Sequence, residues 1–322
     1  MPSPERRAAS AAERLVWGRP EADEAERLIR LAIAEDLPDG DRSSDPLFPD
    51  RAATFADGSR RGGWGVVAHG VLRAAGTVCG VRVVQALFAA LDARVRVVRR
   101  REDGERVAAG EPVFELHGPA AAVLHGERIA LNFLARLSGI ASATARWVDE
   151  LRGLPVVLLD TRKTTPGWRR LEKYAVRAGG GHNHRRDLSD GILVKDNHRD
   201  LLRRGGIADP AVWIAALRAA HPDVFLEVEV DDREQFLAVR ACRVDAILLD
   251  NFALDDLRQA VETNRVLPAP RPVLEASGGI RLDNVRAVAE TGVERISAGV
   301  LTHSAPSLDV SLETVEIEPL ES

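Results

Sequence analysis

The sequence is poor in cysteine and has no long apolar run, and each absence excludes a class of protein. Its 322 residues include two cysteines, Cys79 and Cys242, too few for a disulfide-stabilised scaffold. No stretch reaches the ~18 uninterrupted apolar residues that a membrane-spanning helix needs. Residues 1–14 are polar and rich in Ala and Arg, without the apolar core of a secretory signal. We therefore expect a disordered start and a cytoplasmic protein.

The chain also lacks an excess of positive charge. Its 44 Lys and Arg residues against 49 Asp and Glu residues give a formal net charge of −5. This balance does not support a nucleic-acid-binding surface, although a locally basic pocket for a small anion stays compatible with it. A hydrophobic content of 45% and a charged content of 29% are typical of a folded globular protein of one or two domains.

Lysine is scarce, because arginine supplies almost all of the basic residues. The three lysines are Lys163, Lys173 and Lys195, and they fall close together in the sequence. A lysine ammonium is a compact point charge, whereas the arginine guanidinium is a planar fork, so the two do not replace each other in a shaped site. We interpret Lys163 and Lys195 as functional and Lys173, inside a predicted helix, as structural. The alternative is chance clustering of a rare residue.

The first half of the chain predicts an α+β domain, with strands first and helices beside them. The expected helices span 21–35, 81–91 and 120–151, the last with a candidate break at Ser138-Gly139. The expected strands span 64–68, 71–78 and 95–99, with a strand pair within 104–118.

The second half predicts parallel βα units, because short apolar strands alternate with helical stretches. The strands end at Asp160, Lys195, Glu229, Asp250, Ser277 and Gly299. An open doubly wound sheet and an α/β barrel both fit this alternation. A polar residue or glycine at every strand end favours a barrel whose rim is one continuous site. Because fewer than eight strands are found, we expect the barrel to be incomplete.

Two rim segments are rich in cationic side chains. Arg162 and Lys163 are adjacent in the loop after the first barrel strand, and His184 and Arg185 follow the glycines 179–181. Glycines allow close backbone approach, and guanidinium and imidazole groups suit carboxylates. We favour an anion site over a metal site at His182 and His184, because neighbouring arginines repel a cation. The structural alternatives are a solvated charged loop for the first segment and a flexible glycine loop for the second.

The remaining rim residues are acids and glycine loops. Glu229 and Asp250 end consecutive strands, where a pair of carboxylates can hold Mg²⁺ and sugar hydroxyls, or can instead pair with rim arginines. Ser277-Gly-Gly279 and Ser297-Ala-Gly299 follow the last two strands, the usual place of a phosphate in barrels. Together these residues describe a site for a phosphorylated sugar and an anionic acceptor.

Nearly the whole chain carries motifs of one known family. They include Glu127-Arg-Ile-Ala-Leu-Asn-Phe-Leu-Ala-Arg-Leu-Ser-Gly-Ile-Ala141, Asp160-Thr-Arg-Lys-Thr-Thr-Pro-Gly167, Asn183-His-Arg185, Lys195-Asp-Asn-His198, Glu229-Val-Asp231, Leu249-Asp-Asn-Phe252, Glu275-Ala-Ser-Gly-Gly279 and Leu301-Thr-His303. On these motifs the sequence resembles the quinolinate phosphoribosyltransferases, also called nicotinate-nucleotide pyrophosphorylases (carboxylating). It departs from the family at Asp187, where the family has glycine, and at Gly40-Asp-Arg-Ser-Ser44.

The resemblance implies a fold and an assembly. It implies an incomplete, roughly seven-stranded α/β barrel over residues 130–304, and a separate N-terminal α/β sandwich over 15–129 that the tail 305–322 joins. It also implies a homodimer, or a higher oligomer, in which the sandwich of one subunit covers the barrel mouth of the other. Quinolinate and phosphoribosyl pyrophosphate would be the ligands, with no nucleic acid and no membrane.

The resemblance also implies the reaction and the roles of residues. Quinolinate and phosphoribosyl pyrophosphate, with Mg²⁺, would give nicotinate mononucleotide, pyrophosphate and CO₂ in NAD biosynthesis. The residues implied to bind the substrates are Arg162, Lys163, His184, Arg185 and Lys195, Arg128 from the neighbouring subunit, Ser277, Gly278, Gly279 and Gly299 for the 5′-phosphate, and His303 at the same mouth. Glu229 and Asp250 would bind Mg²⁺ and the ribose, and with Lys195 they form the predicted catalytic set.

Two rival hypotheses follow from the same residues. One is the molybdenum-transport-associated homologue of this family, which the intact Asn183-His-Arg185 and Lys195-Asp-Asn-His198 motifs disfavour. The other is a phosphosugar-binding barrel without catalysis, which Glu229 and Asp250 disfavour, because binding alone does not need two acids among so many cations.

Overall fold

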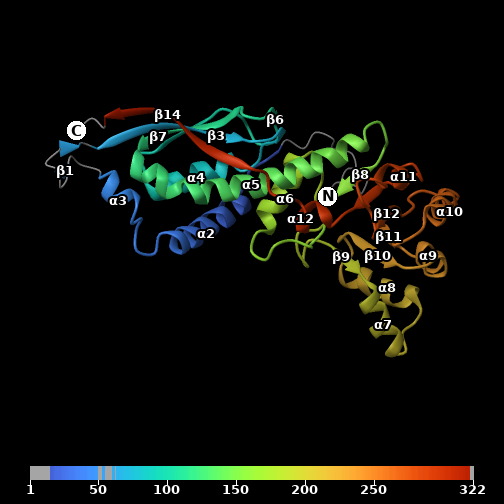
Figure 1. Ribbon diagram of the computed structural model, residues 1–322. Helices are drawn as coiled ribbons and strands as arrows, with labels where there is room; N and C mark the ends of the chain where they lie inside the picture. The colour runs from blue at the N-terminus through green and yellow to red at the C-terminus, as the bar shows by residue number, and fades with distance from the viewer. Residues whose placement is uncertain (1–14, 50–52, 55–59, 62, 320–322) are drawn as a thin grey trace. The chain divides into compact units, whose positions relative to one another are not determined.

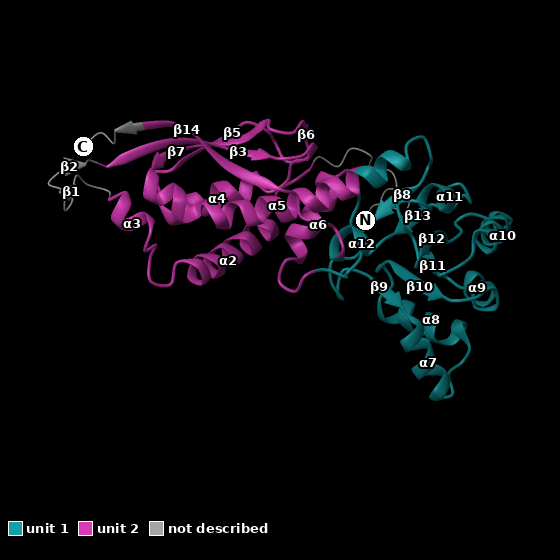
Figure 2. Ribbon diagram, in the orientation of Figure 1, with its two compact units in different colours: residues 1–14, 146–164, 181–303 teal, residues 15–145, 165–180, 304–322 magenta. Residues whose placement is uncertain are grey.

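The computed structural model describes residues 15–49, 53–54, 60–61 and 63–319, so the predicted disorder of residues 1–14 lies outside the described part. The chain forms two compact units (Figure 2). The N-terminal unit comprises residues 15–145, 165–180 and the segment from 304 onward, and the barrel unit comprises 146–164 and 181–303. The predicted domain bounds 15–129 and 130–304 stay a prediction.

The N-terminal unit is built on an antiparallel sheet in the order β14-β3-β7-β5. Its strands are β3 (Trp64–Leu72), β5 (Arg96–Arg99), β7 (Pro112–Pro119) and β14 (Val310–Pro319). Helices α2 (Arg19–Asp36), α4 (Val81–Leu91) and α5 (Ala120–Glu150) lie along one side of it (Figure 1). The smaller elements are α3 (Ser44–Leu47) and the strand pairs β1 (Ala53–Thr54) with β2 (Arg60–Arg61) and β4 (Gly76–Thr77) with β6 (Arg106–Val107).

Two glycines that resemble chain breakers in the sequence are sites of close packing instead. The predicted strands 64–68 and 71–78 are wrong in their division, since β3 runs unbroken through His69 and Gly70 to Leu72. A Cβ at Gly70 would overlap the ring of Phe114, a fully buried core residue, so glycine is needed there for packing. Likewise α5 is continuous at Gly139, where the backbone of Pro306 approaches too closely for any side chain.

Helix α6 (Arg169–Ala178) belongs to the N-terminal unit although barrel segments precede and follow it. Glu172, whose surface is fully buried, anchors it there. Its Oε1 lies 2.7 Å from Arg136 Nη2 of α5 and accepts a 2.8 Å hydrogen bond from Thr165 Oγ1, and its Oε2 accepts one from the Thr165 N–H. Lys173, interpreted as structural, is buried in the same helix.

The barrel unit contains a parallel sheet of six strands in the order β8-β13-β12-β11-β10-β9. They are β8 (Val157–Leu159), β9 (Ile192–Val194), β10 (Leu226–Val230), β11 (Ala246–Asp250), β12 (Val273–Ser277) and β13 (Arg295–Ser297). Its helices are α7 (Asp196–Arg204), α8 (Pro210–Ala220), α9 (Arg233–Arg240), α10 (Leu254–Arg265), α11 (Val285–Ala289) and α12 (Val300–His303).

A seventh strand position exists beside β8 as a single bridge. Leu159 pairs in parallel with His182, whose N–H donates to Leu158 and whose carbonyl accepts from the Asp160 N–H. Because β13 pairs with the other side of β8, this bridge extends the sheet to seven positions. The predicted incomplete α/β barrel of about seven strands is therefore confirmed as a fold class.

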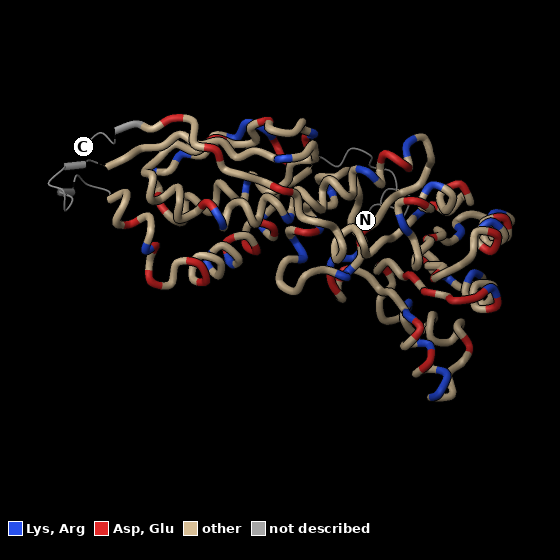
Figure 3. Tube along the Cα trace, in the orientation of Figure 1, with Lys and Arg blue, Asp and Glu red and all other residues tan. Residues whose placement is uncertain are grey.

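Acidic and basic residues are interspersed along both units, as the low net charge suggests (Figure 3). Over the residues that the structure describes, we find no helix with the length and apolarity required to span a bilayer.

Removal of the Glu172 carboxylate should unfold the protein at lower urea. We expect Glu172→Ala to reduce the free energy of unfolding by ~3–5 kcal/mol, because it removes the buried carboxylate that pairs with the partly buried Arg136 guanidinium. Glu26→Ala, which breaks an exposed ion pair with Arg30, is the control and should change it by less than ~0.5 kcal/mol. Equal effects of the two substitutions in urea titrations would contradict this account.

Candidate active site at the mouth of the barrel

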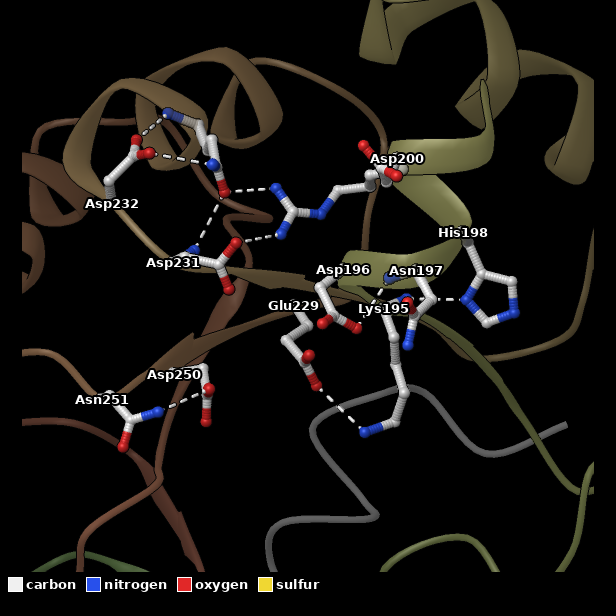
Figure 4. Close-up of polar contacts among 12 residues, drawn as sticks. Lys195, Asp196, Asn197, His198, Asp200, Glu229, Asp231, Asp232, Asp250 and Asn251 are labelled. Carbon is white, nitrogen blue, oxygen red and sulfur yellow. Dashed lines mark hydrogen bonds and ion pairs between the residues drawn. The ribbon is translucent and has the colours of Figure 1, made fainter. Parts of the chain in front are cut away.

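The site lies at the carboxyl ends of the barrel strands, where parallel pairing places successive strand ends at one edge. Lys195 follows β9, Glu229 lies near the end of β10, Asp250 ends β11 and Ser277 ends β12. Figure 4 shows the side chains of Lys195, Glu229 and Asp250 converging there. The structure thus brings together these predicted site residues.

An acidic group forms one side of the mouth. One carboxylate oxygen each of Glu229, Asp231 and Asp250 lies within 4.8 Å of the other two. Burial and repulsion by Glu229 and Asp231 raise the pKa of Asp250, and Lys195 opposes that rise. Lys195 Nζ lies 3.1 Å from Glu229 Oε2. Crowded carboxylates of this kind fit a hard cation such as Mg²⁺.

Asp231 is the member of this group that sequence reasoning missed. It belongs to the Glu229-Val-Asp231 motif and lies just after β10, so its period-2 relation to Glu229 was the available signal. Its Oδ2 also accepts a 2.6 Å hydrogen bond from Arg199 Nη2 of α7.

A pair of cations forms the other side. Burial and the positive charge of Arg162 lower the pKa of Arg185, whereas Glu227 raises it. Among the described residues, the buried Arg162 Nε has no hydrogen-bond partner. Arg185 Nη1 donates to the Gly191 carbonyl at 2.9 Å, which fixes one edge of its guanidinium. Two guanidinium groups held close enough to repel each other form a ready site for an anion.

Asp160 holds the loop that carries Arg185. It is fully buried at the end of β8, and its two carboxylate oxygens accept hydrogen bonds from Asn183 Nδ2 at 2.6 Å and from the His184 N–H at 2.8 Å. The sequence showed Asp160 as a strand end, but not as the acceptor for a loop more than twenty residues away, because that pairing depends on the tertiary fold.

His184 is turned into the barrel interior. Its Nε2 lies 2.9 Å from Glu227 Oε2 and 3.5 Å from Glu275 Oε1, and its Nδ1 accepts a 2.7 Å hydrogen bond from the Arg185 N–H. Its predicted contact with substrate stays a prediction. Glu227 and Glu275 had no role in the sequence prediction, although Glu227 shares the strand face of Glu229.

Lys163 and His303 meet across Gly299. A Cβ built on Gly299 would lie 2.9 Å from Lys163 Cδ and 3.1 Å from His303 Nε2. Thr302 Oγ1 donates to the Lys163 carbonyl at 2.8 Å and ties α12 to the loop after β8. The absence of a side chain at Gly299 therefore leaves room for both Lys163 and His303, as their predicted common location requires.

The glycine loop after β12 adjoins the acidic group. Gly278 has φ +81° and Gly279 has φ +59°, a left-handed conformation that favours glycine. A Cβ at Gly278 would overlap the Asn251 side chain and lie 2.8 Å from Asp250 Oδ1. Asn251, itself at φ 57°, donates a 2.7 Å hydrogen bond to Asp250. The loop thus lies directly beside Asp250.

Arg128 is exposed on α5 in the N-terminal unit. Its predicted role in a neighbouring subunit's site stays a prediction.

Comparison with known proteins identifies the family to which this arrangement belongs. The family model for the C-terminal domain of quinolinate phosphoribosyl transferase matches residues 140–313, and the model for the N-terminal domain matches residues 59–138. The chain belongs to the quinolinate phosphoribosyltransferase family. The two family models meet within α5, which continues through the junction without a break.

Relatives of this transferase agree with the family models. A Bacillus subtilis protein described as a probable nicotinate-nucleotide pyrophosphorylase [carboxylating] is 40% identical over 89% of this chain and 92% of its own length. The human nicotinate-nucleotide pyrophosphorylase [carboxylating] is 40% identical over 74% of this chain and 78% of its own.

A solved structure of the Francisella tularensis nicotinate-nucleotide pyrophosphorylase superposes with a TM-score of 0.80 and 32% identity, covering 91% of this chain and 96% of that one.

Substitution of Gly278 should lower activity because the new side chain displaces site residues, and not only because it strains the backbone. We expect Gly278→Ala to lower catalytic efficiency at least ~10-fold, because the new Cβ displaces Asn251 and Asp250. Gly153→Ala is the matched control, with φ +85° but no atom within 4 Å of the place that its new methyl group would take. Both variants should lose thermal stability through the backbone strain that they share, and only the first should lose activity. Equal activities would separate Gly278 from the site.

Proposed function

We propose that the two charge groups of the barrel mouth divide the reaction of the family between them. The chain is a pentosyltransferase that transfers the phosphoribosyl group of phosphoribosyl pyrophosphate to quinolinate, and it forms nicotinate mononucleotide, pyrophosphate and CO₂ for NAD biosynthesis. The acidic group, defined as Glu229, Asp231 and Asp250, receives the sugar, and the cation pair Arg162 and Arg185 receives the acceptor.

The observation that supports the acceptor site is the mutual repulsion of the cation pair. Burial and the positive charge of Arg162 lower the pKa of Arg185, so the pair gains stability when an anion joins it. Quinolinate carries two carboxylates on adjacent ring carbons, and two guanidinium forks match that geometry. Lys163, Lys195 and His184 complete the predicted substrate-binding set around the acceptor and the pyrophosphate.

The acidic group suits the donor sugar. Glu229 and Asp250 would hold Mg²⁺ and the ribose hydroxyls, and Asp231 adds a third carboxylate to that site. The chemistry that a bound Mg²⁺ supplies is neutralisation of the charge on the pyrophosphate leaving group. As the bond to pyrophosphate lengthens, the sugar gains oxocarbenium character, and the carboxylates of Glu229 and Asp250 stabilise that positive charge.

The phosphate and the decarboxylation complete the assignment. Ser277, Gly278, Gly279 and Gly299 would hold the 5′-phosphate through the loops after β12 and β13. Attack by the pyridine nitrogen makes the ring cationic, and the cationic ring stabilises the carbanion that remains when the 2-carboxylate leaves as CO₂. A proton from water then adds to that carbon and gives nicotinate mononucleotide. The task of the protein is to position two mutually repelling anions, which the surrounding cations achieve.

Substitutions on the two sides should have separable kinetic effects. We expect Arg162→Ala to raise the KM for quinolinate ~10–100-fold, because a charge-assisted contact is lost. We expect Asp250→Asn to lower kcat ~100–1000-fold, with a quinolinate KM within ~3-fold of wild type. Steady-state kinetics with each substrate varied in turn would measure both.

The choice of acceptor tests the assignment as a whole. The wild-type enzyme should use quinolinate far better than nicotinate, which leaves part of the cation pair unpaired. Comparable efficiencies with the two acids would contradict the acceptor site, and the lack of product from either would favour a binding protein or an altered relative.

We further propose a cytoplasmic homodimer whose sites are shared between subunits. Cys79 and Cys242 are both free thiols, as is usual in a reducing compartment. Arg128, exposed on α5, would cross to the partner's barrel mouth and contact a quinolinate carboxylate, so that Arg128 and Lys195 of one site come from different chains.

Subunit mixing tests this arrangement. The Arg128→Ala and Lys195→Ala homodimers should each be nearly inactive. After exchange, each heterodimer holds one site with both lesions and one with none, so activity should recover to about a quarter of wild type if the sites are independent. No recovery, with exchange verified by mass spectrometry, would place Arg128 in the site of its own chain or give it a structural role.

A further inference from the structure

Two buried glutamates lie beneath the cationic side of the mouth. Their presence is unexpected, because a carboxylate repels the anion that this side is proposed to bind. Glu227 on β10 is 1% exposed and Glu275 on β12 is fully buried. Both carboxylates approach Nε2 of the His184 ring, Glu227 at 2.9 Å and Glu275 at 3.5 Å. Buried carboxylates are costly unless they are paired, so this arrangement needs a reason.

The imidazole of His184 connects these glutamates to the acceptor site. Because the Arg185 N–H donates to Nδ1, a ring hydrogen lies on Nε2, the atom that lies 2.9 Å from Glu227. The ring is thus held at both nitrogens, by the glutamates on one side and by the backbone of Arg185 on the other. A shift of the ring would therefore shift Arg185.

The charges near the glutamates support the same role. Burial and repulsion by Glu227 raise the pKa of Glu275, while His184 and Arg295 act in the opposite direction. Glu227 also attracts the Arg185 guanidinium and so offsets part of the repulsion that it experiences from Arg162. Glu227 thus lowers the cost of keeping Arg162 and Arg185 close together when no acceptor is bound.

We propose that Glu227 and Glu275 are positioning residues that act through the His184 imidazole to fix Arg185 in the acceptor site, and so set the preference for a dicarboxylate over a monocarboxylate. This inference rests on the proposed binding of acceptor carboxylates by Arg162 and Arg185. The glutamates do not contact the substrate. Their effect reaches it through the position of the loop 182–185.

The first test separates the two substrates. Glu227→Gln and Glu275→Gln keep the side-chain shape and remove the charge, and each should raise the KM for quinolinate ~5–20-fold. The KM for phosphoribosyl pyrophosphate should stay within ~2-fold and kcat within ~3-fold of wild type, and the preference for quinolinate over nicotinate should fall. Glu294→Gln is the control, because Glu294 accepts from the Leu274 N–H outside this cluster. An equal rise in both KM values would overturn the proposal.

The second test asks whether the effect passes through His184. In a His184→Ala background, Glu227→Gln and Glu275→Gln should change the KM for quinolinate less than ~2-fold, because coupled residues are not additive. His184→Gln, which keeps an N–H near the position of Nε2, should recover much of the affinity lost in His184→Ala. Full additivity, or no recovery with Gln, would overturn the proposal even if a glutamate variant folds poorly.

A third variant distinguishes failure of the inference from failure of the proposed function. Arg185→Ala should raise the KM for quinolinate more than either glutamate variant. An unchanged KM in Arg185→Ala would refute the acceptor site itself, whereas a raised KM together with unaffected glutamate variants would refute only the positioning role.

Discussion

The architecture of the mouth depends on one buried carboxylate, Asp160, and the two hydrogen bonds that it accepts. They join the end of β8 to Asn183 and His184, and beside them the Leu159–His182 bridge supplies the seventh strand position of the barrel. A strand position of one residue has little pairing of its own to hold it. The side-chain hydrogen bonds of Asp160 therefore do what a longer ladder does elsewhere in the sheet, and they place the cationic loop where the sheet would otherwise end.

The sequence predicted the barrel strands well because parallel buried strands are short apolar runs closed by a polar residue. Glu229 and Asp250 could be placed on one rim for that reason, and their oxygens do come together. The bridge at His182 could not be predicted, since one residue after three glycines has no periodicity. Helix α7 was also missed, because its first residues, from Asp196 to His198, are all polar and His198 caps it through the Lys195 N–H.

Other errors in the sequence prediction arose from a local signal that was present but misleading. Gly70 and Gly139 punctuate the sequence like turns, yet both lie inside regular elements because a neighbour occupies the space of a side chain. Glu227 and Glu275 look like the polar half of an alternating strand, and only the barrel fold shows that this half faces an interior. In both cases the deciding fact is the distance to a residue far away in sequence.

The path of the chain through α6 has a consequence for how this enzyme can be divided. The segments that carry Arg162 and Arg185 are joined by residues 165–180, and these pack in the N-terminal unit, where the Tyr174 hydroxyl donates to the half-buried Asp103. A barrel excised from the chain would keep α6 but expose the face that Leu171 and Tyr174 bury. The two units are therefore not modules that recombination could exchange freely, because α6 of the N-terminal unit lies in sequence between two segments of the barrel. When the N-terminal unit changes in evolution, α6 must change with it. That helix lies in sequence between the two barrel segments that carry Arg162 and Arg185.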